Sequence, residues 1–482
     1  MERAVVDRLI AAVGAGAVLT EPAALRAYEC DGLTGYRVIP AAVVLPSSTE
    51  EVAAVVQACH RAGVPFVARG AGTGLSGGAL PVAEGIVISL ARMRTILDVD
   101  IAAERVTVQP GVSNLAVSDA VASWGYFYAP DPSSQAVCSI GGNVAENSGG
   151  AHCLKYGFTL HHVCGVTLVT ADGRIARIGG KAPDAPGLDL CAAIVGSEGT
   201  LGIVTEVVLR IVPRPQAVLT MLAAFDSMAA AGSAVSEIIA AGIVPAAVEM
   251  MDRLTREAAE AAVGAGYPDC EALLLVEVDG PQLETGAVGA AVDSICRGCG
   301  ATEIRSTEDS SERAAMWRGR RSAFAAMGRV SPSYYVQDGV IPRTRLADVL
   351  DGIQLLENEY GLRVGNVFHA GDGNLHPLVL YDAAIQGEST RALELAGRIL
   401  DVCLASGGSI TGEHGVGVDK ACQMPKMFSE GALEVMARLR AAFDPSGLCN
   451  PGKVLPTPRL CGEVPGVYRA HPLERAGLAE RM

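Results

Sequence analysis

Aromatic and positively charged residues are scarce in this sequence. Phe, Trp and Tyr make up 4% of the 482 residues, and 38 Lys and Arg stand against 53 Asp and Glu, for a net charge of −15. A chain this acidic, with so few stacking side chains, is poorly suited to binding nucleic acid or an anionic membrane surface. Half of the residues are hydrophobic, which excludes disorder as the main state and allows large buried cores.

Runs of cysteine are also absent. The 13 cysteines are scattered, so that no group can hold an iron–sulfur cluster, and no CxxCH haem motif occurs. The single CxxC, Cys296 to Cys299, has no second pair at zinc spacing, and we interpret it as part of a loop. Most cysteines are expected to be buried free thiols of a reducing compartment.

No segment of the sequence is long and apolar enough to span a bilayer. The stretch 238–248 is short and is interrupted by Pro245. The apolar run 9–19 resembles a short signal sequence, but it follows no positively charged region, and the apolar residues from Val6 to Val13 have helical spacing. We therefore expect a docked amphipathic helix at the N-terminus and a cytoplasmic protein.

The length allows about two to four domains. Residues 43–68 have the pattern of strand, helix and strand, with a capping box formed by Ser48 and Glu51. Short strands and glycine-rich loops continue to Pro213. After it, strands alternate with longer helices, which predicts an α+β domain with helices on one face of a sheet. The predicted parts are an N-terminal helical segment 1–37, a first domain 38–214, a second domain 215–456 ending in helices, and a tail 457–482.

The most distinctive local feature is the glycine-rich string RGAGTGLSGG at residues 69–78, which follows a predicted strand. A Rossmann motif needs a helix directly after its glycines, and Gly77, Gly78 and Pro81 prevent one. A P-loop needs Gly-Lys-Ser/Thr, which is missing. Two interpretations remain, a tight surface turn and a nest of backbone N–H groups that suits a pyrophosphate. Further small-residue segments at 131–150 and 196–203 favour a nest, because backbone can hold an extended ligand along its length.

Three of the eight histidines lie in two glycine-flanked segments. In NVFHAGDGNLHP, residues 366–377, a hairpin folded about Asp372 and Gly373 would place His369 opposite His376, with Cβ atoms about 5 Å apart. The string GEHG adds Glu413 and His414. Two imidazoles and a carboxylate form an open, zinc-type ligand set. The alternative is that these histidines are hydrogen-bonded structural residues.

Together these strings resemble one known group of proteins. RGAGTGLSGGALP, DPSSQ, IGGNVAENSGG and GSEGTLGI are similar to the FAD domain of the vanillyl-alcohol-oxidase (PCMH-type) superfamily. More narrowly, residues 35–455 resemble the family of FAD-binding glycolate oxidase subunits and FAD-linked D-lactate and D-2-hydroxyglutarate dehydrogenases. The resemblance implies an α+β fold, with a PCMH-type FAD-binding domain followed by an α+β substrate domain and a C-terminal helical segment.

The resemblance also implies how FAD is bound. The first loop would hold the pyrophosphate, and the other segments the rest of the cofactor. Members with covalent flavin carry a His where this chain has Thr73, so the FAD is expected to be non-covalent. The implied FAD-binding residues are Arg69, Gly70, Ala71, Gly72, Thr73, Gly74, Leu75, Ser76, Pro132, Ser133, Ser134, Gly141, Gly142, Asn143, Asn147, Glu198, Gly199, Gly202, Ile203 and Asn450.

Metal-dependent members of this family bind a divalent ion through two histidines and a Glu, and the next His is the catalytic base. By resemblance these roles fall on His369, His376 and Glu413, with zinc or manganese as the ion, and on His414.

Three residues are implied to bind the substrate. An arginine that faces the substrate carboxylate corresponds to Arg320, for which the alternative is a solvated helix face. Arg343 is a second candidate, and Asn374 is a further substrate contact. D-2-hydroxyglutarate relatives carry Lys where this chain has Val336, which favours a smaller acid.

The resulting hypothesis is FAD-dependent oxidation of a small 2-hydroxy acid, glycolate or D-lactate, to the 2-oxo acid. The alternatives are a D-2-hydroxyglutarate-type dehydrogenase, a flavin reductase that uses a nicotinamide donor, and an electron-transfer subunit without substrate chemistry of its own. Since the chain has no motif for a second redox centre, electrons are expected to pass to an external acceptor. The resemblance points to an iron–sulfur partner subunit and to an assembly at the inner membrane.

Overall fold

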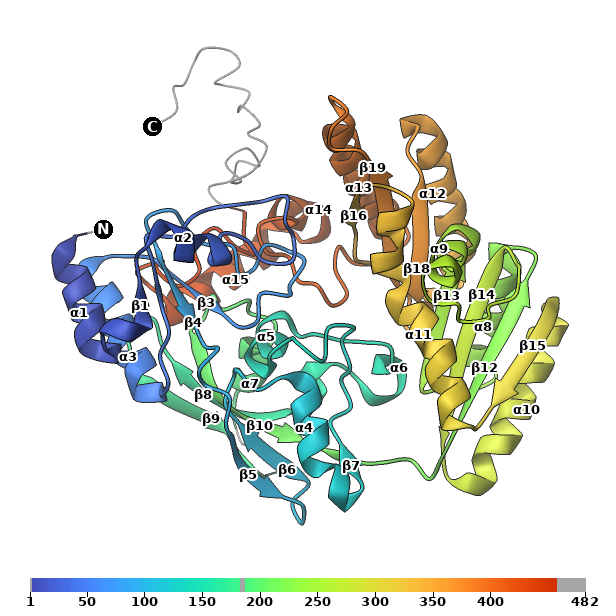
Figure 1. Ribbon diagram of the computed structural model, residues 1–482, viewed down its shortest axis with the longest axis horizontal. Helices are drawn as coiled ribbons and strands as arrows, with labels where there is room; N and C mark the ends of the chain where they lie inside the picture. Colours follow the sequence, from blue (N-terminus) through green and yellow to red (C-terminus); the bar gives the residue numbers. More distant parts are fainter. Residues whose placement is uncertain (1, 183–186, 457–482) are drawn as a thin grey trace. The chain divides into compact units, whose positions relative to one another are not determined.

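A computed structural model describes residues 2–182 and 187–456, so that the expected tail 457–482 lies outside the described residues. The chain forms two compact units (Figure 1). Unit 1 takes in the described parts of Met1–Gly149, Phe158–Pro213 and Glu413–Met482, and unit 2 takes in Gly150–Gly157 and Arg214–Gly412. The change of pattern near Pro213 is a unit boundary. The partition differs from the sequence-based ranges because the chain returns to unit 1 after Gly412, where the amide of Phe66 bonds the carbonyl of Leu448.

The first sheet of unit 1 has the order β1-β2-β4-β3. Strands β2, β4 and β3 are parallel, and β1 pairs with β2 antiparallel at one edge. The three parallel strands are buried at almost every position, as their continuous apolar sequences require. Ser48 caps α3 by accepting a hydrogen bond from the amide of Glu51, and α1 docks against α3 through Val5 and Leu9, as expected for the N-terminal helix. Glu51 bonds the amide of Ser47 rather than that of Ser48, so the capping box is displaced by one residue. The bounds are α1 Arg3–Val13, β1 Val18–Leu19, α2 Pro22–Leu25, β2 Ala42–Val44, α3 Thr49–Ala62, β3 Phe66–Arg69 and β4 Ile86–Ser89.

The second sheet of unit 1 is antiparallel, with the order β5-β6-β10-β8-β9. Strands β7 and β11 form a separate antiparallel pair. The inward-facing residues alternate along β10, as expected for a sheet with one buried face. The bounds are β5 Ile96–Asp100, β6 Arg105–Val108, α4 Asn114–Val121, β7 Tyr126–Phe127, α5 Ile140–Glu146, β8 Val163–Val169, β9 Ile175–Gly179, α7 Leu190–Ile194, β10 Ile203–Arg210, β11 Val212–Pro213, α14 Met424–Met427 and α15 Glu430–Phe443.

Unit 2 is built on one large sheet with the order β15-β12-β14-β13-β18-β19-β16, and β17 also pairs with β19. All of its strand pairs are antiparallel. The strand bounds are β12 Ala217–Phe225, β13 Ala247–Asp252, β14 Ala272–Gly280, β15 Ala301–Thr307, β16 Ser333–Val336, β17 Gly339–Val340, β18 Val364–His369 and β19 Asn374–Tyr381.

Helices cover both faces of this sheet, so the expectation of one covered face is wrong. One set of alternate strand residues packs against α9 and α11, including Met251 and Val367. The strands also contact α8, α10 and α13, which contribute no residue to that cluster. Strands β13 and β14 are buried at almost every position, as expected for strands that are covered on both faces. The helix bounds are α6 Cys153–Tyr156, α8 Met228–Ala240, α9 Arg253–Val263, α10 Gln282–Gly298, α11 Ser310–Ala326, α12 Leu346–Tyr360 and α13 Glu388–Ala405.

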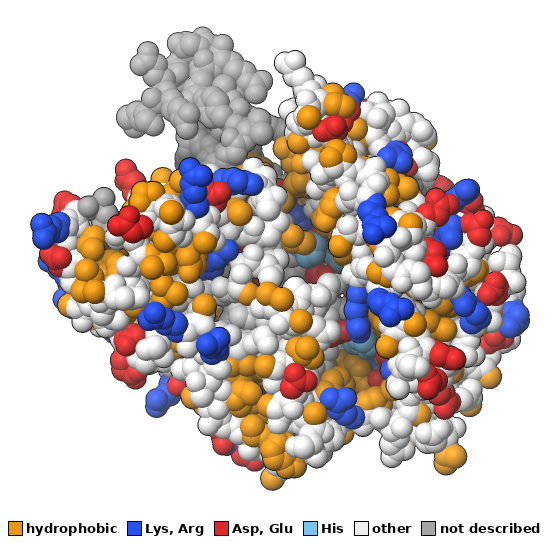
Figure 2. All heavy atoms as spheres, in the orientation of Figure 1, with side chains coloured by type: hydrophobic (Ala, Val, Ile, Leu, Met, Phe, Trp, Pro, Cys, Tyr) orange, Lys and Arg blue, Asp and Glu red, His pale blue; other side chains and the backbone are white. Residues whose placement is uncertain are grey.

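Most cysteines of the described residues are buried, as predicted. The CxxC is not in a loop, because Cys296 is buried in α10 and Cys299 caps that helix. Within the described part of the chain, no helix meets the length and apolarity needed to cross a bilayer. Acidic and basic side chains are interspersed over the face shown in Figure 2.

Candidate active site

The glycine-rich loop of unit 1 leaves β3 at Arg69 without starting a helix, which confirms the exclusion of a Rossmann motif. Gly72 and Gly77 have φ angles of +74° and +75°, which favour glycine. There is little space for side chains, since a Cβ at Gly70 would overlap Ser139 Oγ and one at Gly72 would overlap the Arg69 guanidinium. The loop is therefore a backbone surface that other segments approach closely.

Two buried polar side chains of unit 1 mark where a polar ligand fits against these loops. Ser76 is fully buried, and its Oγ has no hydrogen-bond partner among the described residues. Asn143 is 1% exposed, and across residues 2–182 and 187–456 neither of its side-chain polar atoms finds a partner. Buried polar groups are normally hydrogen-bonded. The loops and these orphaned groups fit a phosphate-bearing cofactor such as FAD.

The second small-residue segment contains a short helix that the sequence did not indicate. Ser139 caps α5 by accepting a hydrogen bond from the amide of Gly142, and the helix ends at Asn147 with a φ of +52°. Asn147 Oδ1 accepts a hydrogen bond from the amide of Leu160. Residues 132–134 form a turn, in which the Pro132 carbonyl accepts a bond from the amide of Gln135.

The third segment ties the C-terminal part of unit 1 to the glycine loop. Glu198 accepts hydrogen bonds from the amides of Val416 and Gly417, both at 2.6 Å. Asn450 Nδ2 donates to the carbonyls of Gly78 at 2.9 Å and Glu198 at 2.6 Å. These two polar side chains, both expected to bind FAD, thus hold protein backbone.

A pair of buried carboxylates lies beside this loop. Burial raises the pKa of Glu198 to about 7, although the two backbone amides and the nearby lysines oppose the shift. Burial and the charge of Glu198 together raise the pKa of Glu146 well above its usual value of 4.5. A Cβ on Gly415 would overlap Glu146 Oε2, so glycine is needed where the GEHG string passes these acids.

The N-terminal segment reaches the glycine loop, which the sequence did not predict. A Cβ at Gly32 would lie 2.7 Å from the carbonyl oxygen of Gly74, and Asp31 accepts a hydrogen bond from the amide of Ala79. Arg69 donates to the carbonyl of Cys30 at 2.7 Å. An acidic residue next to glycine is too common a pattern to have indicated this contact.

In unit 2, the predicted histidine hairpin exists, but its register differs from the expectation. β18 pairs with β19 so that His369 lies opposite Asn374, and His376 lies opposite Val367. The centre of the turn lies one residue earlier than expected, between Gly371 and Asp372, and the amide of Gly373, at φ +81°, bonds the carbonyl of His369. The two imidazoles are diagonal neighbours on one face of the sheet, with ring centroids 5.0 Å apart, and can still share one ion.

Glu249 connects the histidine hairpin to Arg320. One carboxylate oxygen lies 2.7 Å from His369 Nδ1, and the other accepts a hydrogen bond from Arg320 Nε at 2.6 Å. Arg320 is 3% exposed, which excludes the solvated helix face. Burial would raise the pKa of Glu249, but Arg320 and His369 outweigh burial and hold it below its usual value. Glu249 was not predicted from the sequence. The available signal was an acidic residue surrounded by the apolar residues of the segment 246–251.

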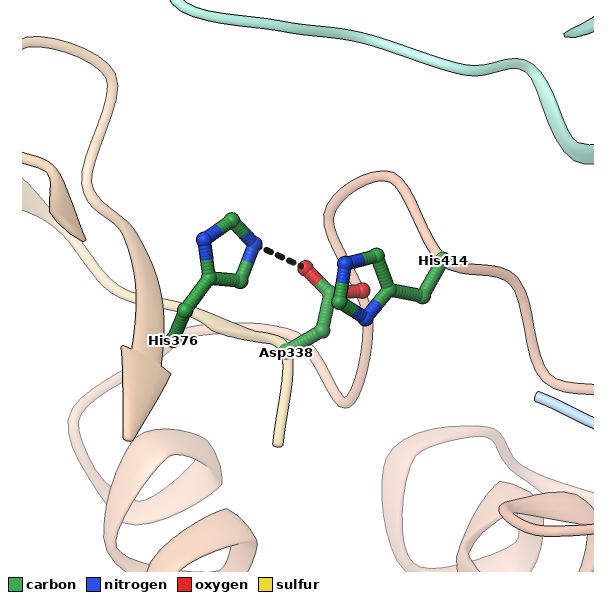
Figure 3. A group of neighbouring side chains, drawn as sticks. All are labelled: Asp338, His376 and His414. Atoms are coloured by element: carbon green, nitrogen blue, oxygen red, sulfur yellow. Dashed lines mark ion pairs between the residues drawn. The ribbon is translucent and has the colours of Figure 1, made fainter. Parts of the chain in front are cut away.

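Asp338 joins the hairpin to the segment that precedes GEHG. Its Oδ1 lies 3.4 Å from His376 Nε2, the ion pair drawn in Figure 3. Its Oδ2 accepts hydrogen bonds from Thr411 Oγ1 at 2.5 Å and from the amide of Gly412 at 2.9 Å. Asp338 is fully buried, and it was not predicted from the sequence as a site residue.

The other predicted substrate residues lie on the same hairpin. Asn374 is 2% exposed, and its amide atoms have no hydrogen-bond partner within the described ranges. A Cβ at Gly412 would lie 2.6 Å from the Asn374 side chain. Arg343 Nη1 donates to the carbonyl of Gly371 in the hairpin turn. Unit 2 thus brings His369, His376, Asn374, Arg320 and Arg343 into one region.

Glu413 and His414 belong to unit 1. The chain crosses from unit 2 between Gly412 and Glu413, so the Cα of Glu413 follows that of Gly412 by about 3.8 Å. On the unit 1 side, a Cβ at Gly149 would lie 2.8 Å from Glu413 Oε2. Their roles as metal ligand and base stay predictions.

Comparison with known proteins finds one family match in each half of the chain. Residues 40–179 match the family described as "FAD binding domain", and residues 214–454 match "FAD linked oxidases, C-terminal domain". The chain is 52% identical to the glycolate oxidase subunit GlcD of Escherichia coli (strain K12) over 92% of this chain and 89% of that protein. It is 40% identical to GlcD of Bacillus subtilis (strain 168), covering 89% and 91% of the two chains.

More distant relatives extend the comparison. The D-lactate dehydrogenase of Archaeoglobus fulgidus is 33% identical, over 86% of this chain and 91% of that protein. The solved structure of p-cresol methylhydroxylase shares the fold, with a TM-score of 0.79 at 18% identity and coverage of 94% and 96%, which confirms the PCMH-type α+β fold. From its two matched domains and these relatives, the chain belongs to the family of FAD-linked oxidases, with an FAD-binding domain and the C-terminal domain of that family.

Proposed function

We propose that this protein oxidises a small 2-hydroxy acid to the 2-oxo acid with FAD as its cofactor. The observation that supports this most directly is the set of polar residues on one buried face of the unit 2 sheet. Glu249, His369, Asn374 and His376 share that face, and Arg320 reaches it from α11. Burying these groups among apolar residues is costly unless they bind a ligand or one another.

Each of these residues has a task that suits a 2-hydroxy acid. The guanidinium of Arg320 holds the substrate carboxylate, with Arg343 as the second cation. Asn374, with both amide atoms unpaired among the described residues, orients the hydroxyl or carboxylate oxygen. His414 takes the hydroxyl proton on an imidazole nitrogen as general base. FAD, when bound, supplies the acceptor for the hydride from the substrate Cα.

His369, His376 and Glu413 would hold a divalent ion, zinc or manganese. The donor set fits, since the imidazoles lie 5.0 Å apart between ring centroids and Glu249 engages Nδ1 of His369. The ion, when bound, would lower the pKa of the substrate hydroxyl.

We propose glycolate or D-lactate as the substrate, rather than a dicarboxylate. The surroundings of His376 are apolar on the side of Phe324, whose ring centroid lies 5.8 Å from that of the imidazole. Val336 pairs with Leu378 and packs in the same apolar cluster. A short uncharged substituent on the substrate fits this wall better than a second carboxylate, whose burial there would be unfavourable.

The electron acceptor is proposed to be a partner subunit with iron–sulfur clusters, in an assembly at the inner membrane. The sequence has no cluster motif of its own, and two relatives are named as subunits of glycolate oxidase.

Anaerobic titration of the FAD-loaded protein with glycolate, D-lactate, L-lactate and D-2-hydroxyglutarate tests the activity. We expect glycolate or D-lactate to bleach the flavin absorbance directly. Bleaching by a nicotinamide donor alone would instead identify a reductase, and bleaching by none of these compounds would leave an electron-transfer subunit. Acid precipitation should release the flavin into the supernatant, because Thr73 stands where covalent members carry His.

A further inference from the structure

We propose that Glu249 is a positioning residue that orients the metal-binding His369 and the carboxylate-binding Arg320 at the same time. This inference rests on the proposed function, which assigns those two roles. Glu249 lies directly opposite His369 in the β13–β18 pair, and its side chain is 1% exposed. The antiparallel register therefore places the carboxylate next to the imidazole, on the same face of the sheet.

The first consequence concerns the tautomer of His369. An ionised carboxylate only accepts hydrogen bonds, so the proton of the His369–Glu249 contact sits on Nδ1. The lone pair is then on Nε2, where a neutral imidazole binds a metal ion. Carboxylate partners of this kind fix the ring orientation of metal-binding histidines and increase their basicity.

The second consequence concerns Arg320. Its Nε donates to Glu249 Oε2, and its Nη2 lies 2.6 Å from the same oxygen, so Glu249 occupies one edge of the guanidinium. A planar guanidinium held along one edge has a fixed plane and can offer its remaining N–H groups to one further carboxylate.

The third consequence is electrostatic. Arg320 and a divalent ion at His369 would both be positive in a buried region, and their repulsion would weaken metal binding. Glu249 offsets the charge of Arg320 between the two positions. Removal of Glu249 leaves Arg320 as an uncompensated buried charge next to the metal site.

The test uses the full-length, FAD-loaded protein and measures zinc and manganese binding by calorimetry in the absence of substrate. We expect Glu249→Gln to weaken metal binding by about 10–100-fold. It should also raise the glycolate or D-lactate concentration that gives half-maximal flavin reduction. Arg320→Met should raise that concentration without weakening metal binding, because the Glu249–His369 contact remains and a nearby positive charge is removed.

Asp252→Asn is the matched control for a general loss of stability. Asp252 is on the same strand and accepts hydrogen bonds from the amides of Asn366 and Thr255, without contact to His369 or Arg320. We expect this variant to have a lower melting temperature and an unchanged metal affinity. If Glu249→Gln does not fold, the double variant Glu249→Gln/Arg320→Met removes the unpaired charge and should still bind metal weakly.

The outcomes separate this inference from the proposed function. Wild-type metal affinity in folded Glu249→Gln, with affinity lost in His369→Ala, would overturn the positioning role and keep the metal site. Failure of the wild-type protein to bind either ion would overturn the metal site and the inference together.

Discussion

Asp338 accepts a hydrogen bond from the amide of Gly412 at 2.9 Å, one residue before Glu413. The same carboxylate oxygen accepts from Thr411 Oγ1, and the other oxygen pairs with His376. On the far side of GEHG, Glu198 accepts from the amides of Val416 and Gly417. A buried carboxylate thus holds the chain on each side of Glu413 and His414: Asp338 before them, within unit 2, and Glu198 after them, within unit 1.

Asp338→Asn should slow flavin reduction by the substrate. An Asn can accept through only one oxygen, so its amide group would face a donor and the Thr411–Gly412 segment would shift. A displacement on the order of 1 Å at a reacting group costs up to about 100-fold in rate, and we expect a loss of about 10–100-fold. Stopped-flow reduction under anaerobic conditions measures it. Asp252→Asn serves as the control, and a rate for Asp338→Asn equal to that of this control would show that Asp338 has only a structural role.

His414→Ala should lose the general base while keeping FAD. We expect the rate of flavin reduction to fall by about 10²–10⁴-fold, with a much smaller change in substrate affinity. The measurement is again anaerobic stopped flow, with FAD content checked by absorbance. A variant reduced at the wild-type rate would assign the proton transfer to another group.

Glu146→Gln should flatten the pH dependence of stability. The pKa of Glu198 is raised from 4.5 to about 7, and that of Glu146 is raised as well. The folded protein therefore holds protons that the unfolded chain releases near pH 4.5, and its free energy of unfolding falls as the pH rises through about 7. Replacing Glu146 removes one of these groups and the repulsion between them. We expect a gain on the order of 1–3 kcal/mol at pH 8 relative to wild type, and little change at pH 5.

Urea unfolding of the FAD-loaded protein at both pH values provides this comparison. Glu277→Gln is the control, because burial is outweighed there by hydrogen bonds from His152, Thr220 and Trp317, and the pKa of Glu277 is lowered to about 2. The stabilisation from Glu277 is present above pH 4.5 and disappears as the pH falls through about 2. Between pH 5 and pH 8 the Glu277 carboxyl itself stays ionised, so its variant should be less stable than wild type at both pH values. An equally steep dependence in Glu146→Gln and wild type would contradict the assignment.

The proposed acceptor predicts slow reoxidation by air. Protein reduced by substrate should react slowly with oxygen, and an artificial dye acceptor should restore turnover. Stopped-flow mixing of reduced protein with oxygen is the measurement. Stoichiometric peroxide at the turnover rate would identify a true oxidase that requires no partner subunit.

The glycine loop shows how far local sequence can predict this site. Gly77, Gly78 and Pro81 exclude a helix after β3 whatever surrounds them, because backbone conformation is limited residue by residue. The structure confirms that loop. The sequence predicted a hairpin that carries His369 and His376, but the pairing of its strands depended on which residue closed the turn. The amide of Gly373 bonds the carbonyl of His369, and the turn is centred one residue earlier than expected, since alternative closures of this kind look alike in sequence.

The sequence by itself determined which residues are chemically able to act: two histidines beside a glycine turn, a Glu–His pair, an arginine and three backbone-rich loops. Only the tertiary structure decided which acids support them. Glu249, Asp338 and Glu198 are single carboxylates far from their partners in the chain, and each acts across more than 70 positions. The physical reason is that a buried carboxylate is tolerated wherever the fold brings hydrogen-bond donors from a distant strand or loop next to it. Such long-range contacts leave no periodic signal along the sequence.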